Sequence, residues 1–327
     1  MTNTYTIGIA GSTQHTTTCA QAIAADPRFE VSFVLTPSPK ALGRKQIVTE
    51  NPLHVWANQN SIPSVLIDTK ITTAVRSEVE NVNLLGRPID FLLVVDFGYL
   101  VPDWLLELPE LAPLNVHPSA LPDWRGSSPG QFVLLSGAKR SAFTLMRMSP
   151  RLDDGPIIWQ EWFDVNPIWT HADYYQTAFS ILATGLAGQI AMYAQSVLDG
   201  SPAHTLQPEL SPTPVARRLT REDGMVAWQR VKKLINGEKV EDDSSDSPLL
   251  HELTNNSGQS WLEILPRAAR ALSPWPGLWT IVPTSKGPKR MKLLSILVAE
   301  GKVSLEQVQI EGQLPAAFSA VKNLIDD

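Results

Sequence analysis

Cysteine is almost absent from this chain, since Cys19 is the only one. A single cysteine excludes an intramolecular disulfide and a cysteine-cluster metal site, and it favours a reducing, cytoplasmic setting. Basic residues are also scarce, because 33 acidic residues outnumber 27 Lys and Arg and give a formal net charge of −6. This balance argues against indiscriminate binding to nucleic acid, although it is compatible with a local basic patch.

Long apolar runs are lacking as well. The runs fall short of the roughly 20 residues that span a bilayer, so the sequence predicts no membrane segment, and the polar residues 1–6 predict no secretion signal. Internal repeats and coiled-coil patterns are also missing, and we therefore expect a monomer.

Strand and helix patterns alternate through the first 200 residues. Continuous apolar runs such as residues 91–95 are typical of strands buried on both faces of a parallel sheet. The expected strands are residues 5–10, 31–35, 65–67, 91–95, 114–117, 143–148 and 157–165, and the expected helices are 16–25, 52–60, 71–82, 99–108, 130–135 and 172–199. The pattern predicts an α/β fold with a doubly wound, mostly parallel sheet.

The length of 327 residues favours two domains. A proline-rich segment predicts a linker at 201–218, between a catalytic domain at 1–200 and a β domain at 219–327. The expected elements of the last domain are a helix at 261–272 and strands at 278–282, 291–298 and 303–310. The acidic stretch 237–258 predicts a mobile excursion, and residues 36–45 predict a loop that is either functional or merely solvated.

One stretch carries an amide and an imidazole two residues apart, Asn115 and His117, directly before Pro118. In an extended backbone such side chains project to the same side, and the proline keeps His117 out of helical geometry. Open α/β sheets bind ligands at the carboxyl ends of their strands. We therefore expect this pair to meet Asp153, on the loop after the next strand, at one ligand.

An amide N–H and a protonated imidazole aimed at one point would stabilise a developing oxyanion, while a neighbouring carboxylate holds the imidazole in one tautomer. This constellation suits acyl transfer to an amine through a tetrahedral intermediate. A nucleophile–base dyad is less favoured, because no serine or cysteine is evidently coupled to His117. From spacing alone, an ordinary hydrogen-bonded pair at a strand end is the simpler explanation of Asn115 and His117.

The motifs around this pair resemble the folate-dependent formyltransferase family. Residues 115–122, Asn-Val-His-Pro-Ser-Ala-Leu-Pro, resemble its Asn-x-His-x-Ser-Leu-Leu-Pro signature, and Trp-Arg-Gly at 124–126 narrows the resemblance to the methionyl-tRNA formyltransferase branch. Leu-Asp-Asp-Gly at 152–155 is similar to the family's Leu-Asp-x-Gly, and Ser-Pro-Trp-Pro-Gly at 273–277 to the motif that opens its C-terminal β domain. Gly-Arg-Lys at 43–45 resembles its tRNA-contacting loop.

The resemblance implies a formyltransferase-type sheet domain and a smaller, OB-like C-terminal β barrel. It implies formyl transfer from 10-formyltetrahydrofolate, without a metal, to the α-amine of initiator methionyl-tRNA. Asn115 and His117 would then stabilise the oxyanion, with His117 also moving a proton and Asp153 orienting it. The implied folate-pocket residues are Ser119, Ala120, Leu121 and Pro122, and the implied tRNA contacts are Arg44, Lys45, Lys286, Lys289, Arg290 and Lys292.

The chain departs from the family pattern at residues 11–15, where Gly-Ser-Thr-Gln-His replaces Gly-Thr-Pro-x-Phe, and at Asp123, where a basic or neutral residue is usual. These departures concern substrate affinity rather than the reaction. Two alternatives stay open. One is a formyltransferase for a small amine, such as an amino sugar or glycinamide ribonucleotide, and the other is a catalytically silent tRNA- or folate-binding module.

Overall fold

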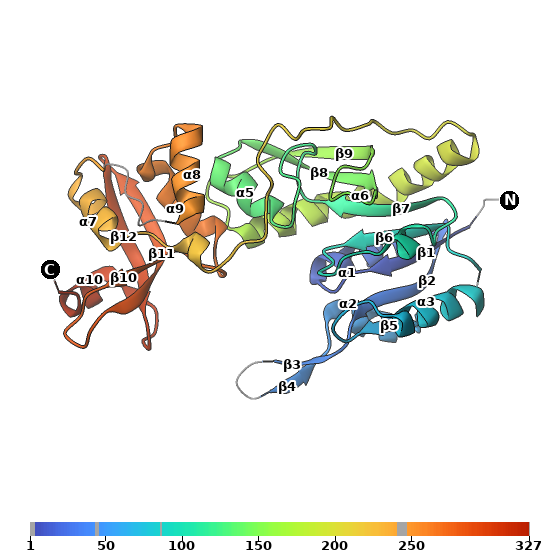
Figure 1. The fold of residues 1–327 in the computed structure, drawn as a ribbon, viewed down its shortest axis with the longest axis horizontal. Coiled ribbons are helices and arrows are strands. Elements are labelled where there is room, and N and C mark those ends of the chain that lie inside the picture. Colours follow the sequence, from blue (N-terminus) through green and yellow to red (C-terminus); the bar gives the residue numbers. More distant parts are fainter. Residues whose placement is uncertain (1–3, 43–45, 86, 241–246, 327) are drawn as a thin grey trace. The chain divides into compact units, whose positions relative to one another are not determined.

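The computed structural model describes residues 4–42, 46–85, 87–240 and 247–326, and Figure 1 labels its helices and strands. The chain forms two compact units, which are described separately below. The first comprises Met1–Arg125, Ala142–Phe163 and Tyr175–Val215, and the second comprises Gly126–Ser141, Asp164–Tyr174 and Ala216–Asp327.

The first unit is built on a seven-stranded sheet with the order β5-β2-β1-β6-β7-β8-β9. The strands are β1 (Tyr5–Ala10), β2 (Phe29–Pro37), β5 (Ser64–Ile67), β6 (Phe91–Val95), β7 (Ala112–His117), β8 (Arg140–Arg147) and β9 (Ile157–Asp164). The first five of these strands pair in parallel, whereas β8 runs antiparallel to β7. The predicted α/β fold with a mostly parallel sheet is therefore confirmed.

Helices cover this sheet, and capping residues and prolines set where several of them begin or end. The helices are α1 (Gln14–Ala24), α2 (Pro52–Gln59), α3 (Thr73–Leu85), α4 (Asp103–Leu106) and α6 (His171–Leu198). A capping box of Thr13 and Thr16 opens α1, and Asn51 caps α2. The helix predicted at 99–108 is wrong in length, since Pro102 is the N-cap of α4 and Pro109 keeps the preceding residue out of helical geometry.

The apolar run of β6 is buried at all five positions, as expected for a central strand. It belongs to a core cluster that includes Phe33 and Leu35 of β2 and Val79 of α3. This core fixes the carboxyl ends of β1, β6 and β7 in neighbouring positions, because Ala10 pairs with Val94 and Val94 pairs with Asn115.

Helix α6 corrects the expectation that no segment reaches membrane-spanning length. By length and composition alone, its 28 residues could cross a membrane. In the structure, however, side chains along its length are buried in the protein, among them Tyr174, Leu182 and Ile190. These residues recur along one face of α6, and 39% of its most apolar window is buried, as in an amphipathic helix packed against protein on one side. The sequence run looks shorter than it is because Thr, Ser and Gln interrupt the apolar residues.

Residues 36–49 form more than the predicted loop. A two-stranded hairpin of β3 (Lys40–Leu42) and β4 (Ile47–Thr49) extends away from the main sheet (Figure 1). Hairpin pairing supplies hydrogen bonds to backbone that a simple loop would leave to water. Residues 43–45, which include the predicted tRNA contacts Arg44 and Lys45, lie outside the described residues.

The second unit combines helices with a four-stranded antiparallel sheet in the order β10-β11-β12-β13. The strands are β10 (Trp279–Val282), β11 (Lys289–Ala299), β12 (Lys302–Ile310) and β13 (Ala316–Ala317), and the helices are α5 (Pro129–Ser136), α7 (Trp228–Asn236), α8 (Pro248–Ser257), α9 (Trp261–Ala271) and α10 (Phe318–Val321). The small C-terminal β domain is thus confirmed. The excursion predicted at 237–258 is wrong for α8, because Ser247 caps this helix and Leu249 and Leu250 are buried.

Whether residues 1–200 and 219–327 fold as independent domains, joined by a linker at 201–218, stays a prediction. In the structure, residues 201–215 pack with the first unit rather than hanging between two bodies. A backbone pair between Ile157 and Thr205 fastens this segment, which we call the strap, to the first residue of β9.

Candidate active site

Strand β7 carries Asn115 and His117 at its carboxyl end, as the sequence predicted. The Asn115 amide donates one N–H to the Val94 carbonyl of β6 at 3.1 Å, which leaves its second N–H and its oxygen for another partner. His117 is buried, with 4% of its surface exposed. Its imidazole is therefore held in one orientation by the surrounding protein.

The two nitrogens of His117 have different neighbours. Nε2 lies 3.1 Å from the Trp124 carbonyl oxygen, and a carbonyl can only accept, so Nε2 carries a proton and donates it there. Nδ1 lies 3.7 Å from Oδ2 of Asp153. This separation exceeds an ordinary hydrogen bond, so Nδ1 is the nitrogen that remains available to a reacting group beside the carboxylate.

Asp153 reaches His117 by a route that the sequence did not reveal. Because β8 is antiparallel to β7, Arg147 at its end pairs with Leu114, three residues before His117. The following loop turns back along β7, with Asp153 itself at a φ of 51°. The turn closes at Gly155, where a Cβ would overlap the Arg147 carbonyl oxygen. The expected meeting of Asp153 with His117 is found, although not through shared carboxyl ends of parallel strands.

Burial and a hydrogen bond within the segment hold the residues that are predicted to line the folate pocket. Ser119, Ala120 and Leu121 are buried, and Ser119 Oγ donates to the Asp123 carbonyl at 2.6 Å. These side chains thus shape the loop, and their contact with folate stays a prediction. Two residues missed in the sequence support the loop from β8 and β9. Thr144 donates to the Ser119 carbonyl at 2.8 Å, and Gln160 donates to the Leu121 carbonyl at 2.7 Å.

The strap contacts two segments of the site, the loop that carries Asp153 and residues 122–124 after His117. Gln207 Nε2 donates to the carbonyls of Asp153 at 3.1 Å and Gly155 at 2.7 Å. Ser211 Oγ donates to the Pro122 carbonyl at 2.8 Å, and the Trp124 N–H donates to Thr213 Oγ1 at 2.6 Å. The sequence offered no signal for these residues beyond a proline-rich composition, since their partners are backbone carbonyls and amides.

Arg125 of the Trp-Arg-Gly motif is a strap anchor. It is 8% exposed and donates to Gln207 Oε1 at 2.9 and 3.1 Å and to the carbonyls of Pro208 at 2.7 Å and Glu209 at 3.2 Å. A guanidinium has five N–H donors in a fixed fork, which suits several carbonyl acceptors at once. Arg125 is thereby joined, through Gln207, to the loop that carries Asp153.

The structure divides the cations predicted for the C-terminal sheet. Arg290 and Lys292 alternate with the buried Met291 on β11 and so share the opposite face, whereas Lys289 falls on the face of Met291 and Lys286 lies in the preceding turn. Lys292 pairs in register with Trp279, whose ring lies 4.7 Å from the Arg290 guanidinium carbon. Two of the four predicted cations therefore form one surface with an aromatic ring.

Among the described residues, no group of three or more His, Cys, Asp or Glu is arranged to hold a metal ion. The expectation that the reaction needs no metal stays a prediction. His117 lies beside Asp153, and Asn115 is on the same strand as His117.

Asp123 is a half-buried carboxylate for which no hydrogen bond or ion pair is found among the described residues. Burial raises its pKa above the ordinary value of 3.8. The folded protein then binds more protons than the unfolded chain between these two pKa values, so this carboxyl lowers stability as the pH rises through that range.

We therefore expect Asp123→Asn to be more stable than the original protein at pH 7.5, because the amide removes the cost of burying a charge. The difference should narrow as the pH falls through the raised pKa of the original carboxyl, which then takes up its proton. Urea midpoints of both proteins across this range measure the effect, with the exposed Asp68→Asn as a control. A variant that is less stable at pH 7.5 contradicts the assignment.

Comparison with known proteins adds family information to this geometry. The formyl transferase family profile matches residues 7–181. A methionyl-tRNA formyltransferase of Phenylobacterium zucineum is 30% identical over 265 residues, which cover 81% of this chain and 73% of that protein.

Two solved structures share the fold over most of the chain. A methionyl-tRNA formyltransferase from Clostridium thermocellum aligns with a TM-score of 0.53 and 14% identity, covering 94% of this chain and 98% of that one. An N-formyltransferase from Helicobacter canadensis, solved with folinic acid and dTDP-3-aminofucose, aligns with a TM-score of 0.53 and 17% identity, covering 94% and 95%. At these identities the likeness shows the fold alone.

Proposed function

Because the chain belongs to the formyl transferase family and is thus an enzyme of formyl transfer, we propose that it formylates the α-amine of initiator methionyl-tRNA, with 10-formyltetrahydrofolate as the donor. The observation that carries this proposal is the His117 imidazole, held by the Trp124 carbonyl on one side and facing Asp153 on the other, two residues from Asn115. Such a set fits a carbonyl oxygen that gains negative charge.

The reaction begins with the neutral α-amine of the acceptor. Its nitrogen lone pair attacks the formyl carbon, a C–N bond forms, and the carbonyl electron pair moves onto oxygen. The free N–H of Asn115 donates to this oxyanion, and a protonated Nδ1 of His117 donates beside it. Collapse of the intermediate breaks the bond to N10 of the folate, which takes up the proton that the attacking amine releases.

His117 and Asp153 manage that proton. With Nε2 committed to the Trp124 carbonyl, only Nδ1 can exchange a proton with the reacting groups. The carboxylate of Asp153 lies close enough to stabilise positive charge on the ring, and at 3.7 Å it is too far to hold the Nδ1 proton in a hydrogen bond, so that proton stays available to the reacting groups. An α-amine titrates near neutral pH, so a weak base suffices to release it.

Folate binding is supported by the loop that follows His117. Residues 118–122 leave β7 at the reacting end and are fixed by Thr144 and Gln160, so the donor's formyl group would meet a preformed wall. The donor supplies a single carbon at the formyl oxidation level. In this proposal Asn115 and His117 orient that group.

Transfer-RNA binding is supported by the C-terminal unit and by the extent of the similarity. The relative from Phenylobacterium aligns beyond the matched formyl transferase region, and Arg290, Lys292 and Trp279 offer a cationic and aromatic surface. Arg44, Lys45, Lys286 and Lys289 remain proposed contacts on sequence grounds. We place this function, as a monomer, in the cytoplasm and in translation initiation.

A second candidate is N-formylation of an amino sugar, which the neighbour solved with dTDP-3-aminofucose favours. One assay separates the two functions. The protein is incubated with 10-formyltetrahydrofolate and with methionylated initiator tRNA, uncharged tRNA or dTDP-linked amino sugars. We expect formyl-methionyl-tRNA as the main product, whereas formylation of the sugar alone would establish the second candidate.

A further inference from the structure

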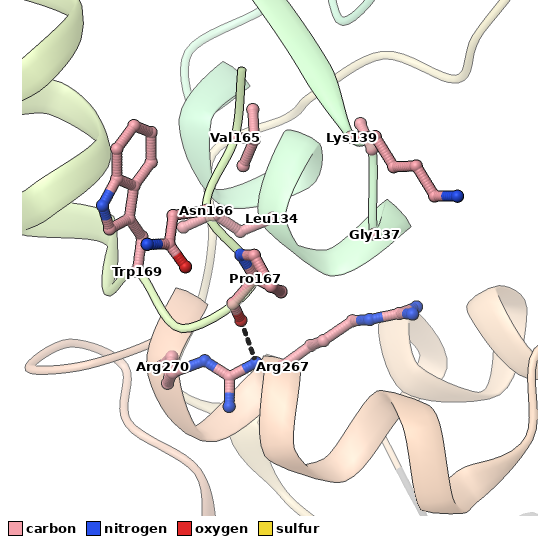
Figure 2. Close-up of a pocket in the computed structure, with 10 residues that line it drawn as sticks. Leu134, Gly137, Lys139, Val165, Asn166, Pro167, Trp169, Arg267 and Arg270 are labelled. Carbon is pink, nitrogen blue, oxygen red and sulfur yellow. Dashed lines mark hydrogen bonds between the residues drawn. The ribbon is translucent and has the colours of Figure 1, made fainter.

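A cavity of about 370 Å³ lies within the second unit, between the end of α5, the segment before α6, and α9 (Figure 2). Three of its ten lining residues are cations, namely Lys139, Arg267 and Arg270, and none of the lining residues is acidic. We propose that this pocket binds a phosphate group, and specifically a backbone phosphodiester of the tRNA acceptor. The tRNA assignment rests on the proposed function, whereas the phosphate chemistry does not.

No ion pair among the described residues neutralises the cations of the pocket, although Arg267 is within electrostatic range of Glu263. The half-buried Arg270 donates to the Pro167 carbonyl at 2.7 Å, a neutral partner. Burial, and then the nearby charge of Arg267, lower the pKa of Arg270. None of the ion pairs found among the described residues includes any of the three cations. An anion in the pocket would offset this repulsion.

The acidic groups close to the pocket are already engaged. Asp164 lies 3.5 Å from the Arg140 guanidinium, outside the lining. Glu263, one turn before Arg267 on α9, accepts from the N–H and hydroxyl of the N-cap Ser260 at 2.9 Å each, as the third-position partner in the capping box of that helix. Neither carboxylate occupies the cavity.

The cations differ in how much structure depends on them. Arg267 donates to Gln259 at 2.8 Å, and its guanidinium lies directly against Gly137, where a Cβ would overlap it. Lys139 is exposed, and Figure 2 shows it extending to the same side as Arg267, with Trp169 on the opposite side of the pocket. Lys139 and Arg270 are therefore the residues to test, because Arg267 also supports the end of α5.

The chemistry of the lining favours a phosphate ester. Guanidinium groups bind phosphate oxygens in paired hydrogen bonds, and an adjacent indole suits a nucleobase or sugar. A cavity of this size accepts a nucleotide-sized group. In a chain with a net charge of −6, local cations of this kind are what an RNA backbone requires.

The test measures binding without the formyl donor, so that it is independent of catalysis. Lys139→Gln and Arg270→Gln remove one charge each, and the melting temperature of each variant is recorded because Arg270 also donates to the Pro167 carbonyl. Each variant should bind uncharged tRNA roughly three- to tenfold more weakly, and the slope of log affinity against log salt should fall by about one. The exposed Lys322→Gln serves as the matched control.

Three outcomes overturn the proposal or its assignment. Unchanged tRNA affinity and salt slope in both variants would remove the pocket from tRNA binding. If dTDP or pyrophosphate binds the original protein and is lost in the variants while tRNA binding persists, the phosphate belongs to a small nucleotide instead. If neither phosphate source responds to the variants, no phosphate site exists. Formylation of methionyl-tRNA is assayed separately, so failure of the proposed function appears there and not in these affinities.

The strap supports a second, independent inference, which also rests on formyl transfer at His117. We infer that Gln207 is a positioning residue, because its amide donates to the carbonyls on both sides of the loop turn that carries Asp153, while its oxygen accepts from Arg125. Gln207→Glu keeps an acceptor for Arg125, removes the donors to the loop and sets a carboxylate oxygen against the two loop carbonyls. The carboxylate of Asp153 would then lose its fixed position beside Nδ1.

We expect Gln207→Glu to lower kcat about tenfold at an unchanged KM for the acceptor and an unchanged melting temperature, since misplacement of a catalytic group affects the transition state more than binding. Gln195→Glu, an exposed glutamine of α6, is the matched control. An unchanged kcat in the Gln207 variant overturns the inference, and so does a loss of kcat that merely follows a loss of folded protein.

Discussion

His117→Ala is expected to lower kcat for formyl transfer by roughly a thousandfold, because one change removes both an oxyanion donor and the group that moves the proton. Each of these contributions is worth about 10² to 10³ in rate where it has been removed singly. The KM of the acceptor should change little, since both lost interactions act on the reacting atoms in the transition state rather than on the bound acceptor. Single-turnover formylation assays with saturating donor measure the effect.

The control for this prediction is His251→Ala, which removes an imidazole from α8 in the second unit. The kcat of this variant should stay within about twofold of the original, because His251 has no role in the proposed mechanism. The buried position of His117 makes a stability check necessary, so the melting temperature of each variant is recorded. A folded His117→Ala protein that keeps more than a tenth of the original kcat would remove this residue from the mechanism.

Arg217→Ala is expected to destabilise the second unit by about 2 kcal/mol, because it leaves a buried carboxylate without its cation while the 45% exposure of the Arg217 side chain screens part of the attraction. Two hydrogen bonds of 2.6 and 2.8 Å join the Arg217 guanidinium to Asp223, which is 2% exposed. Burial opposes ionisation of Asp223, but hydrogen bonds from Arg217 and Thr220 prevail and lower its pKa below 3.8. Urea unfolding at pH 7 measures the loss.

The neighbouring Arg218→Ala is the matched control, since Arg218 is exposed and only its carbonyl takes part in this network. It should change stability by less than about 0.5 kcal/mol. A carboxyl with a lowered pKa adds stability above its ordinary pKa of 3.8 and loses it as the pH falls through the folded value. The advantage of the original protein over Arg217→Ala should accordingly shrink in acid. Equal stability of the two arginine variants at pH 7 would contradict the prediction.

The central strands could be predicted because a run of consecutive apolar residues indicates that a strand is buried on both faces. Five apolar side chains in succession, residues 91–95, can be buried only where both faces of a strand are covered, and β6 has these bounds. The helix at 99–108 was overestimated, because a local apolar pattern continues past Pro102 and Pro109 while the backbone hydrogen bonds cannot.

The candidate site could be predicted only in its composition. The spacing of Asn115 and His117 places both on one side of β7, and that relation is local. The direction of β8 has no such local signal, so the path by which Asp153 returns to His117 came from the register of two strands and a positive φ. The sequence predicts only a linker at the strap, because Gln207 and Thr213 bond to backbone groups, which are the same in every residue type.

The sequence by itself determined the fold class and the family and proposed the reacting side chains, because these depend on short-range spacing and on motifs within single loops. Only the tertiary structure decided which nitrogen of His117 lies beside Asp153, how the strap holds the loop of Asp153, and where Lys139, Arg267 and Arg270 gather. Each of those features joins residues far apart in the chain, and their distances are set by packing and backbone hydrogen bonds rather than by neighbouring residues.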